Sequence, residues 1–176
     1  MKVTRTAAAI LLTGLAAMPF ASCIKGEHDD YEAWREQNDA YLASLNTTEY
    51  ELVVPDWAPQ NSVYIKWHND RSLTADSLVA MSNSTLDIKY ELFDIEGNRL
   101  GDSYMSKDSV YQSRPNQNVV GMWIAMTTMH VGDSATLIIP YPSGYGAQVR
   151  GDIKPYTNLI YNVKIKGIKA LEKPLN

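Results

Sequence analysis

Residues 121–140 read GMWIAMTTMHVGDSATLIIP, and this stretch predicts a short helix followed directly by a strand. Its apolar residues fall first at the spacing i, i+3, i+4 and i+7, which places them on one face of a helix: Met122, Ala125, Met126 and Met129. Val131-Gly132-Asp133 ends the helix, and apolar residues then alternate with other residues up to Pro140. The helix should therefore face a core that the strand helps to form.

Further strands are predicted on both sides of this stretch. Apolar side chains alternate over residues 63–67 and 86–92, a turn follows at Gly97, and a last strand runs from Leu159 to Ile168. Residues 69–83 show no clean period and are predicted to be a loop. Strands and helices do not alternate as they do around a parallel sheet. The sequence therefore predicts an α+β domain in which an antiparallel sheet wraps around a short helix.

Length, composition and charge narrow the possible functions. The chain has 176 residues, of which 45% are hydrophobic and 20% charged, as expected for one folded domain. Its formal net charge of −4 offers no basic surface for a phosphate backbone, so a nucleic-acid partner is not expected. The single cysteine, Cys23, rules out a disulfide framework within the chain and zinc or iron–sulfur sites built from several cysteines.

The first 22 residues have the features of a secretory signal. Lys2 and Arg5 precede an apolar run over residues 7–17, which is shorter than the roughly 20 residues needed to span a bilayer. Phe20-Ala21-Ser22-Cys23 resembles a bacterial lipobox, in which the cysteine thiol receives diacylglycerol and the cysteine becomes the acylated N-terminus. The alternative is an ordinary secretory signal followed by an incidental cysteine.

Lipidation at Cys23 would place an acidic protein on a membrane of the cell envelope. Removal of residues 1–22 leaves 154 residues with 14 basic and 20 acidic side chains, a net charge of −6. Ile24 stands where an aspartate would favour retention at the inner membrane, so the outer membrane is the expected location. More than one acyl chain would hold the protein stably without a spanning helix.

A second helix is predicted before the domain. Asp29 or Asp30 can cap its N-terminus, and large side chains then recur at nearly helical spacing from Tyr31 to Leu45. Its aromatic face could bind a partner, but packing onto the domain behind it is the favoured interpretation. The predicted organisation is a signal peptide at 1–22, a lipidated tether with this helix at 23–48, and the main domain at 49–176.

Several separated segments resemble the FKBP-type peptidyl-prolyl cis-trans isomerases. They are the segments 121–126, 131–140, 144–147 and 153–163, and, upstream, Lys89-Tyr90, 96–100 and Asp102-Ser103. Their order and spacing match the family over about residues 86–168. The resemblance implies the FKBP-like fold, an enzyme that rotates X–Pro bonds, and proline-containing proteins as clients.

The resemblance also implies roles for particular residues. Tyr90 would line the pocket, Tyr145 would donate its hydroxyl to the substrate carbonyl, and Tyr161 would replace a phenylalanine wall. Val119 and Ile153 would contact the ligand through their backbones. From the residues alone, Tyr90 and Tyr161 could equally be cross-strand aromatics of any sheet, whereas Tyr145 lies between two glycines and has little local reason to be buried.

The floor and part of the wall depart from the family pattern. Without a gap before Val131-Gly132, the position of the family's floor tryptophan falls on Met122 and not on Trp123, and the helical face containing Met122 favours the same register. Leu100 stands for a wall phenylalanine. Two further positions stay open: Gly101 or Asp102 for the pocket aspartate, and Val110 or Tyr111 for another aromatic.

Two functions follow from these matches and departures. The first is prolyl isomerisation that assists protein folding in the bacterial envelope. The second is a lipid-anchored binding or scaffold module with weak or no turnover, which the Met122 floor favours. No cofactor is expected, and no metal, because His28, His68 and His130 are far apart and have no partner at ligand spacing.

Overall fold

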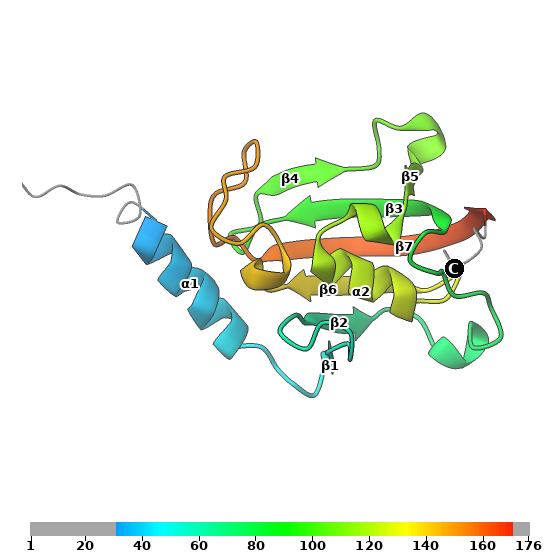
Figure 1. The fold of residues 1–176 in the computed structure, drawn as a ribbon, viewed down its shortest axis with the longest axis horizontal. Coiled ribbons are helices and arrows are strands. Elements are labelled where there is room, and N and C mark those ends of the chain that lie inside the picture. Colours follow the sequence, from blue (N-terminus) through cyan, green and yellow to red (C-terminus); the bar gives the residue numbers. More distant parts are fainter. Residues whose placement is uncertain (1–30, 171–176) are drawn as a thin grey trace, which may run out of the picture.

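One antiparallel sheet forms the frame of the protein in this computed structural model, which describes residues 31–170. Within those residues seven strands pair in the order β1-β2-β6-β7-β3-β4, and β5 also pairs with β3 (Figure 1). The strands are β1 (Glu51–Val53), β2 (Val63–Trp67), β3 (Thr85–Phe93), β4 (Arg99–Asp102), β5 (Tyr111–Ser113), β6 (Ser134–Ile139) and β7 (Leu159–Ala170). The predicted fold class is confirmed.

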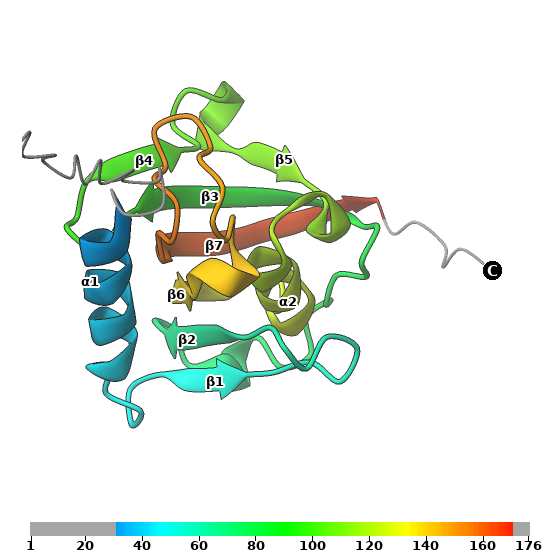
Figure 2. The ribbon, with the colours of Figure 1, turned by 60° about the vertical axis from the view of Figure 1, so that its left-hand side comes forward.

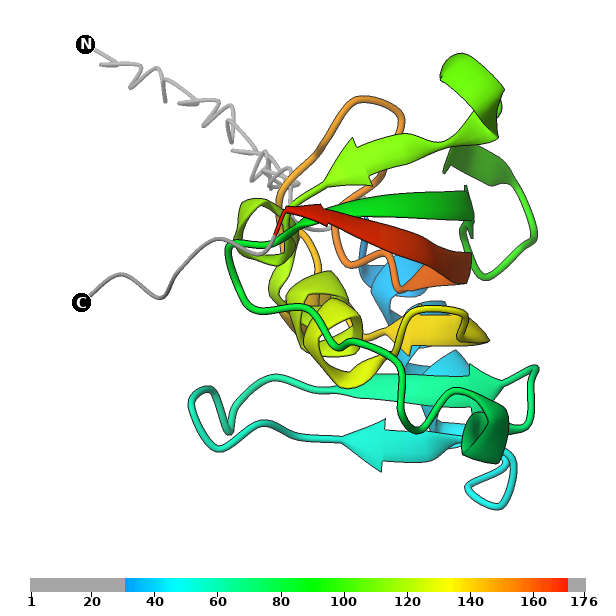
Figure 3. The ribbon, with the colours of Figure 1, turned by 90° about the vertical axis from the view of Figure 1, so that its right-hand side faces the viewer.

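The helix α2 (Val120–Thr128) packs against one face of this sheet (Figure 3). All four apolar residues of its predicted face, Met122, Ala125, Met126 and Met129, are buried in a core with strand residues such as Leu137. Met129 already has an extended backbone, so the helix ends slightly before the predicted Val131-Gly132-Asp133 segment. The 3.6-residue period thus identified the buried face correctly.

Contact between α2 and β6 is unusually close at Gly121. A Cβ atom added to Gly121 would lie 2.3 Å from Cγ2 of Ile139. Only a residue without a side chain fits there, which lets the first turn of α2 approach β6 and fixes the height of the helix above the sheet.

The long strands β3 and β7 pair along their whole length in the middle of the sheet. β3 turns into β4 through Gly97, whose φ of +83° is the left-handed conformation that a tight turn requires. The predicted strands at 63–67, 86–92 and 159–168 and the hairpin at Gly97 are confirmed. β1 and β5 were not predicted because each has three residues and a mostly exposed surface, too short to show alternation.

The helix α1 (Glu32–Ala43) stands at one end of the sheet, across the ends of its strands (Figure 2). Trp34 donates its ring N–H to Oγ1 of Thr157 at 2.9 Å, and Asn38 accepts the backbone N–H of Asn158 at 2.8 Å. The side-chain amide of Asn158 returns a bond to the carbonyl of Asn38 at 2.7 Å. α1 is therefore packed onto the domain through the segment that leads into β7.

Residues 69–83 are fastened to the start of β6 by a buried carboxylate. Asp133 has no exposed side chain surface; its Oδ1 accepts the Thr74 hydroxyl at 2.5 Å and the Asn69 amide at 3.1 Å. Its Oδ2 accepts the His130 backbone N–H at 2.8 Å and lies 3.5 Å from Nε of Arg71. The segment is a loop with one 3-10 turn at Arg71–Leu73, and further backbone bonds, such as that from the N–H of Val131 to the carbonyl of Leu78 at 2.9 Å, hold its later part.

Several predictions concern residues outside the described part of the chain. They are the signal peptide at 1–22, lipidation of Cys23, and capping by Asp29 or Asp30, and they stay predictions. Neither helix within residues 31–170 is long and apolar enough to cross a membrane.

Candidate active site

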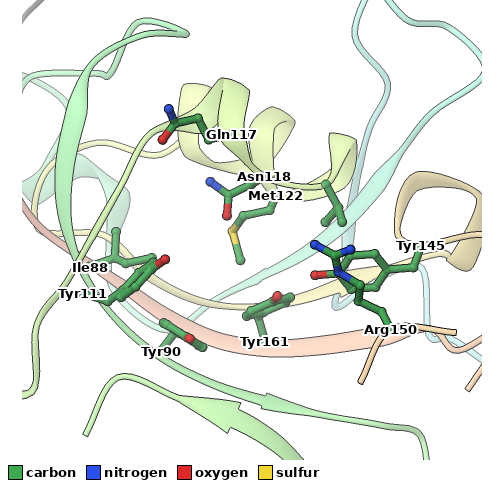
Figure 4. Close-up of a pocket in the computed structure, with 10 residues that line it drawn as sticks. Ile88, Tyr90, Tyr111, Gln117, Asn118, Met122, Tyr145, Arg150 and Tyr161 are labelled. Carbon is green, nitrogen blue, oxygen red and sulfur yellow. The ribbon is translucent and has the colours of Figure 1, made fainter. Parts of the chain in front are cut away.

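A cavity of about 430 Å³ opens between the N-terminal end of α2 and the strands β3, β5 and β7 (Figure 4). The loop between β6 and β7 closes one side. The lining residues are Ile88, Tyr90, Tyr111, Gln117, Asn118, Val119, Met122, Tyr145, Arg150 and Tyr161. Five of the eight predicted catalytic and substrate-binding residues are thus brought together: Tyr90, Val119, Met122, Tyr145 and Tyr161.

Met122 supplies the apolar base of the cavity. It projects from the first turn of α2 toward the tyrosines (Figure 4) and is only 2% exposed. Trp123, the next residue, lines a different hollow on another face of α2. Because successive helix residues point about 100° apart, only one of the two can face the cavity, and that one is Met122.

Three tyrosines from three strands form the wall opposite α2. The ring of Tyr90 lies 5.8 Å from that of Tyr111, nearly edge-on at 78°, and 5.8 Å from that of Tyr161, tilted by 54°. On the sheet, Tyr90 pairs with Val163 and Leu92 pairs with Tyr161, so the two tyrosines are diagonal neighbours on one face. They are at once cross-strand aromatics and cavity-lining residues, which removes the conflict between the two interpretations.

The surroundings of two of these phenols raise their pKa above that of an ordinary tyrosine, which is itself neutral near pH 7. Burial raises the pKa of Tyr161 far above its usual value, and the neighbouring phenols of Tyr145, Tyr90 and Tyr111 raise it further. Burial is also the main cause of the raised pKa of Tyr90, with additional contributions from Tyr111, Asp102 and Tyr145. Both groups therefore remain neutral and able to donate hydrogen bonds at any physiological pH.

Tyr145 reaches the cavity from the loop between β6 and β7. The backbone N–H of Gly146 donates to the carbonyl of Tyr141 at 2.8 Å, and the carbonyl of Gly146 accepts the N–H of Tyr156 at 2.8 Å. Gly146 has a φ of +61°, a left-handed conformation that a glycine adopts without strain. This turn holds Tyr145 against the core and presents its ring to the cavity.

Three predicted residues do not line the cavity. Ile153 is buried in the core. Its backbone N–H already donates to the carbonyl of Arg150 at 3.0 Å, so this donor is used within a turn of the loop. Leu100 packs against the core from β4. The carboxylate of Asp102 accepts the N–H of Tyr104 at 2.6 Å and pairs with Arg99 at 3.2 Å. Their assigned roles in ligand binding stay predictions.

Other lining residues were not predicted. Ile88 is on β3, Gln117 and Asn118 are in the turn before α2, and Arg150 is in the loop before β7. Of the open pair Val110 or Tyr111, it is Tyr111 that lines the cavity. Arg150 is the only charged side chain among the described lining residues. The alternation of β3 could have identified Ile88, which lies two residues from Tyr90 on the same face, but the loop residues carry no comparable sequence signal.

Comparison with known proteins identifies the family. The family model for FKBP-type peptidyl-prolyl cis-trans isomerase matches residues 78–166, about half of the chain. The chain belongs to this family. No curated protein sequence matches it closely. The peptidyl-prolyl cis-trans isomerase from Pseudomonas syringae pv. tomato has a similar structure, with a TM-score of 0.63 and 18% identity over 78% of this chain and 95% of that one.

The structure of FkpA from Escherichia coli is similar as well. Its TM-score is 0.60 with 18% identity, covering 81% of this chain but only 61% of FkpA. At such low identities the two structures establish the shared fold. The family match adds the reaction: this FKBP-type protein is a peptidyl-prolyl cis-trans isomerase, and its cavity is the candidate site.

The cavity suits this reaction because rotation about a peptide bond needs no nucleophile. It needs an apolar base, aromatic walls and donors directed at the carbonyl, and Met122, the tyrosines and the polar residues Gln117 and Asn118 are of these types. Across residues 31–170, histidine, cysteine and acidic side chains form no group of three that could hold a metal ion.

Proposed function

We propose that this isomerase acts on X–Pro bonds of proteins that fold in the bacterial cell envelope. We also propose that a lipid on Cys23 anchors it to the outer membrane. The observation that supports the catalytic part is the tyrosine-walled cavity with Met122 at its base. The envelope location rests on the sequence of residues 1–24.

The cavity lowers the rotation barrier by binding the twisted bond better than either planar isomer. Rotation of a peptide bond costs ~18–20 kcal/mol because the planar form is stabilised by charge-separated resonance. Met122 and the ring faces of Tyr90 and Tyr161 provide surroundings in which that charge separation is poorly solvated. The twisted form carries less charge separation and gains relative to the planar one.

The phenol of Tyr145 is the proposed donor to the substrate carbonyl. Tyr145 enters the cavity from the loop between β6 and β7, while Tyr90 and Tyr161 enter from the sheet (Figure 4). One neutral hydrogen bond contributes about 0.5–1.5 kcal/mol. Tyr145 therefore accounts for a modest part of the acceleration, and the shape and dryness of the cavity account for the rest.

Lipidation at Cys23 would hold this cavity near the bilayer surface. Cys23 lies eight residues before Tyr31, the N-cap residue of α1. Eight residues span at most about 26–29 Å when fully extended. Since α1 is bonded to the domain through Trp34 and Asn38, the tether ends at the domain itself. Clients would be reached close to the membrane.

The catalytic part is tested by the cis-to-trans rate of a Leu–Pro tetrapeptide with the full-length chain. We expect acceleration that falls modestly in Tyr145→Phe and strongly in Tyr161→Ala, and that is unchanged in the control Tyr64→Phe, which lies on β2 away from the cavity. Circular dichroism confirms that each variant is folded. An equal rate in the wild type and both site variants would remove these tyrosines from the site.

The anchor is tested separately with Cys23→Ser. We expect the unmodified chain to incorporate radiolabelled palmitate in bacteria and to sediment with outer membranes, and the variant to do neither. Labelling that persists in the variant would contradict lipidation at Cys23.

A second function is favoured by two features of the site. Asp102 is paired with Arg99 outside the cavity, and the base is a flexible methionine instead of a rigid ring. Both features suit a module that binds proline-containing segments with little turnover. A folded chain that binds such peptides without accelerating their isomerisation would support this function and contradict the enzymatic one.

A further inference from the structure

A second hollow of about 530 Å³ lies on α2 outside the candidate active site. Its lining residues are Trp57, Ala80, Met81, Ser82, Asn83, Asn116, Trp123 and Thr127. The rings of Trp57 and Trp123 contact each other with centroids 4.5 Å apart and planes tilted by 37°. The ring N–H of Trp123 also donates to the hydroxyl of Ser82 at 3.3 Å. Two tryptophans thus form a fixed aromatic surface at this hollow.

The hollow is open and uncharged, and more of its surface is apolar than polar. Trp57 is 53% exposed and Met81 is 46% exposed, although both are large hydrophobic side chains. Leu78 and Val79, just before the lining segment, are exposed as well. None of the described lining residues carries a charge, whereas the chain as a whole is acidic. Contiguous exposed apolar surface of this kind marks a binding site.

The hollow and the active-site cavity share a border. Asn116 lines the hollow, and the next residue, Gln117, lines the cavity. Val119 lines the cavity, and Trp123 lines the hollow one helical turn later. The backbone N–H of Trp123 donates to the carbonyl of Val119 at 3.0 Å. The border is therefore a single ridge of backbone, residues 116–119.

From this continuity we infer that the hollow is a second binding site for the client, which takes an aromatic or large apolar side chain of the polypeptide whose proline occupies the cavity. The inference rests on the proposed isomerase function. One extended chain would cross the ridge, with its proline beside Met122 and an apolar side chain against Trp57 and Trp123. An unfolded polypeptide supplies such a chain, because its apolar side chains are not yet buried.

The chemistry of the hollow suits this occupant, and only the four residues 116–119, which begin in a 3-10 turn at Pro115–Gln117, separate it from the cavity. The side-chain amide of Asn116 at the hollow matches the donors and acceptors of a peptide backbone. The absence of charge among the described lining residues fits an apolar side chain better than a charged one.

The test compares peptides that differ only in where they carry a phenylalanine. The full-length chain is assayed with a Leu–Pro tetrapeptide and with alanine-rich nonapeptides that place phenylalanine two to six residues before or after the proline. We expect kcat/KM to be about two- to tenfold higher for the nonapeptide that carries phenylalanine at one particular distance before or after the proline than for the other nonapeptides. This ratio corresponds to the free energy of one aromatic contact. Trp57→Ala should abolish this gain and leave the tetrapeptide rate unchanged.

Leu73→Ala is the matched control, since Leu73 is 82% exposed and does not line the hollow. Met81→Lys is a second variant that does not depend on the tryptophans, and it should reduce the gain in the same way. Turnover of the tetrapeptide without a gain at any spacing would overturn this inference and leave the isomerase function intact. No turnover of any peptide would overturn the isomerase function itself.

Two other occupants would give different results. A second copy of the chain would make sedimentation depend on concentration, and Trp57→Ala would abolish that dependence. The C-terminal segment 171–176 would compete with clients for the hollow. Deleting it would then raise the gain in kcat/KM that phenylalanine causes in the wild type, but not in Trp57→Ala. Either result without a phenylalanine gain in the unaltered chain overturns the inference.

Discussion

Replacement of Asn38 by alanine should destabilise the domain, although Asn38 does not line the cavity and lies far along the chain from the residues it contacts. Asn38 is fully buried on α1, and its side-chain oxygen accepts the N–H of Asn158 at 2.8 Å. Its side-chain N–H donates to the carbonyl of Trp34 at 2.8 Å. In Asn38→Ala the N–H of Asn158 loses its partner inside the protein, where water does not replace it.

The size of the effect follows from that unpaired group. A buried donor without a partner costs about 1–3 kcal/mol, so the free energy of unfolding should fall by about 2 kcal/mol. With a urea dependence of about 1–3 kcal/mol per molar for a small domain, the unfolding midpoint should fall by about 1 M. The loop beyond should loosen too, because Asn158 accepts the N–H of Tyr141 at 2.9 Å near the turn that presents Tyr145.

Urea unfolding followed by tryptophan fluorescence measures this change, and tetrapeptide isomerisation measures its effect on the site. Glu36→Ala is the matched control, because Glu36 is exposed on the same helix and its loss should change the unfolding free energy by less than about 0.5 kcal/mol. Equal midpoints for Asn38→Ala and Glu36→Ala would refute the reasoning and show that α1 does not stabilise the loop that carries Tyr145.

Three further results are expected. Gly121→Ala should lower the unfolding free energy by about 1–3 kcal/mol in urea titrations, because the new Cβ would overlap Ile139; unchanged stability would contradict the close contact. Burial would raise the pKa of Asp133, but its hydrogen bonds from Thr74, among others, hold it below the usual value. Its stabilisation is therefore present at neutral pH and lost as the pH falls through that lowered value. Wild type and Asp133→Asn should differ in urea stability at pH 7 and converge as the pH falls below the usual pKa of an aspartate; a constant difference would contradict this. Arg150→Gln should lower kcat/KM for a Glu–Pro peptide about twofold to fivefold and leave a Gln–Pro peptide unchanged, because Arg150 is the charged lining residue; equal effects on both peptides would contradict a charge contact.

The helix and the long strands could be predicted because their burial repeats at a local period. The apolar face of α2 and the alternation in β3, β6 and β7 can each be recognised within a short stretch of sequence, and the structure buries those same faces. β1 and β5 are too short to repeat any pattern, and they are strands because longer neighbours offer them paired hydrogen bonds. The segment 69–83 is held in part by Asp133, which lies 64 positions after Asn69 and 59 after Thr74.

The candidate site was predicted in part. The family resemblance placed Tyr90, Tyr161, Met122 and Tyr145 at the pocket, and the helical spacing independently favoured Met122 over Trp123. Asp102 could not be placed, since its direction depends on Arg99 and on the N–H of Tyr104. Arg150 and Asn118 enter the cavity from irregular segments, where the sequence carries no period to predict direction.

The sequence by itself determined the elements with a local period, the family resemblance, and the expected lipid anchor at Cys23. Only the tertiary structure decided that α1 is bonded to the segment before β7, that Ile153 is used within a turn, and that Trp57 meets Trp123 beside the cavity. The reason is that each of these depends on groups distant in sequence whose meeting is set by the packing of the whole chain. Local periodicity specifies which face of an element is buried, but not which distant group that face will meet.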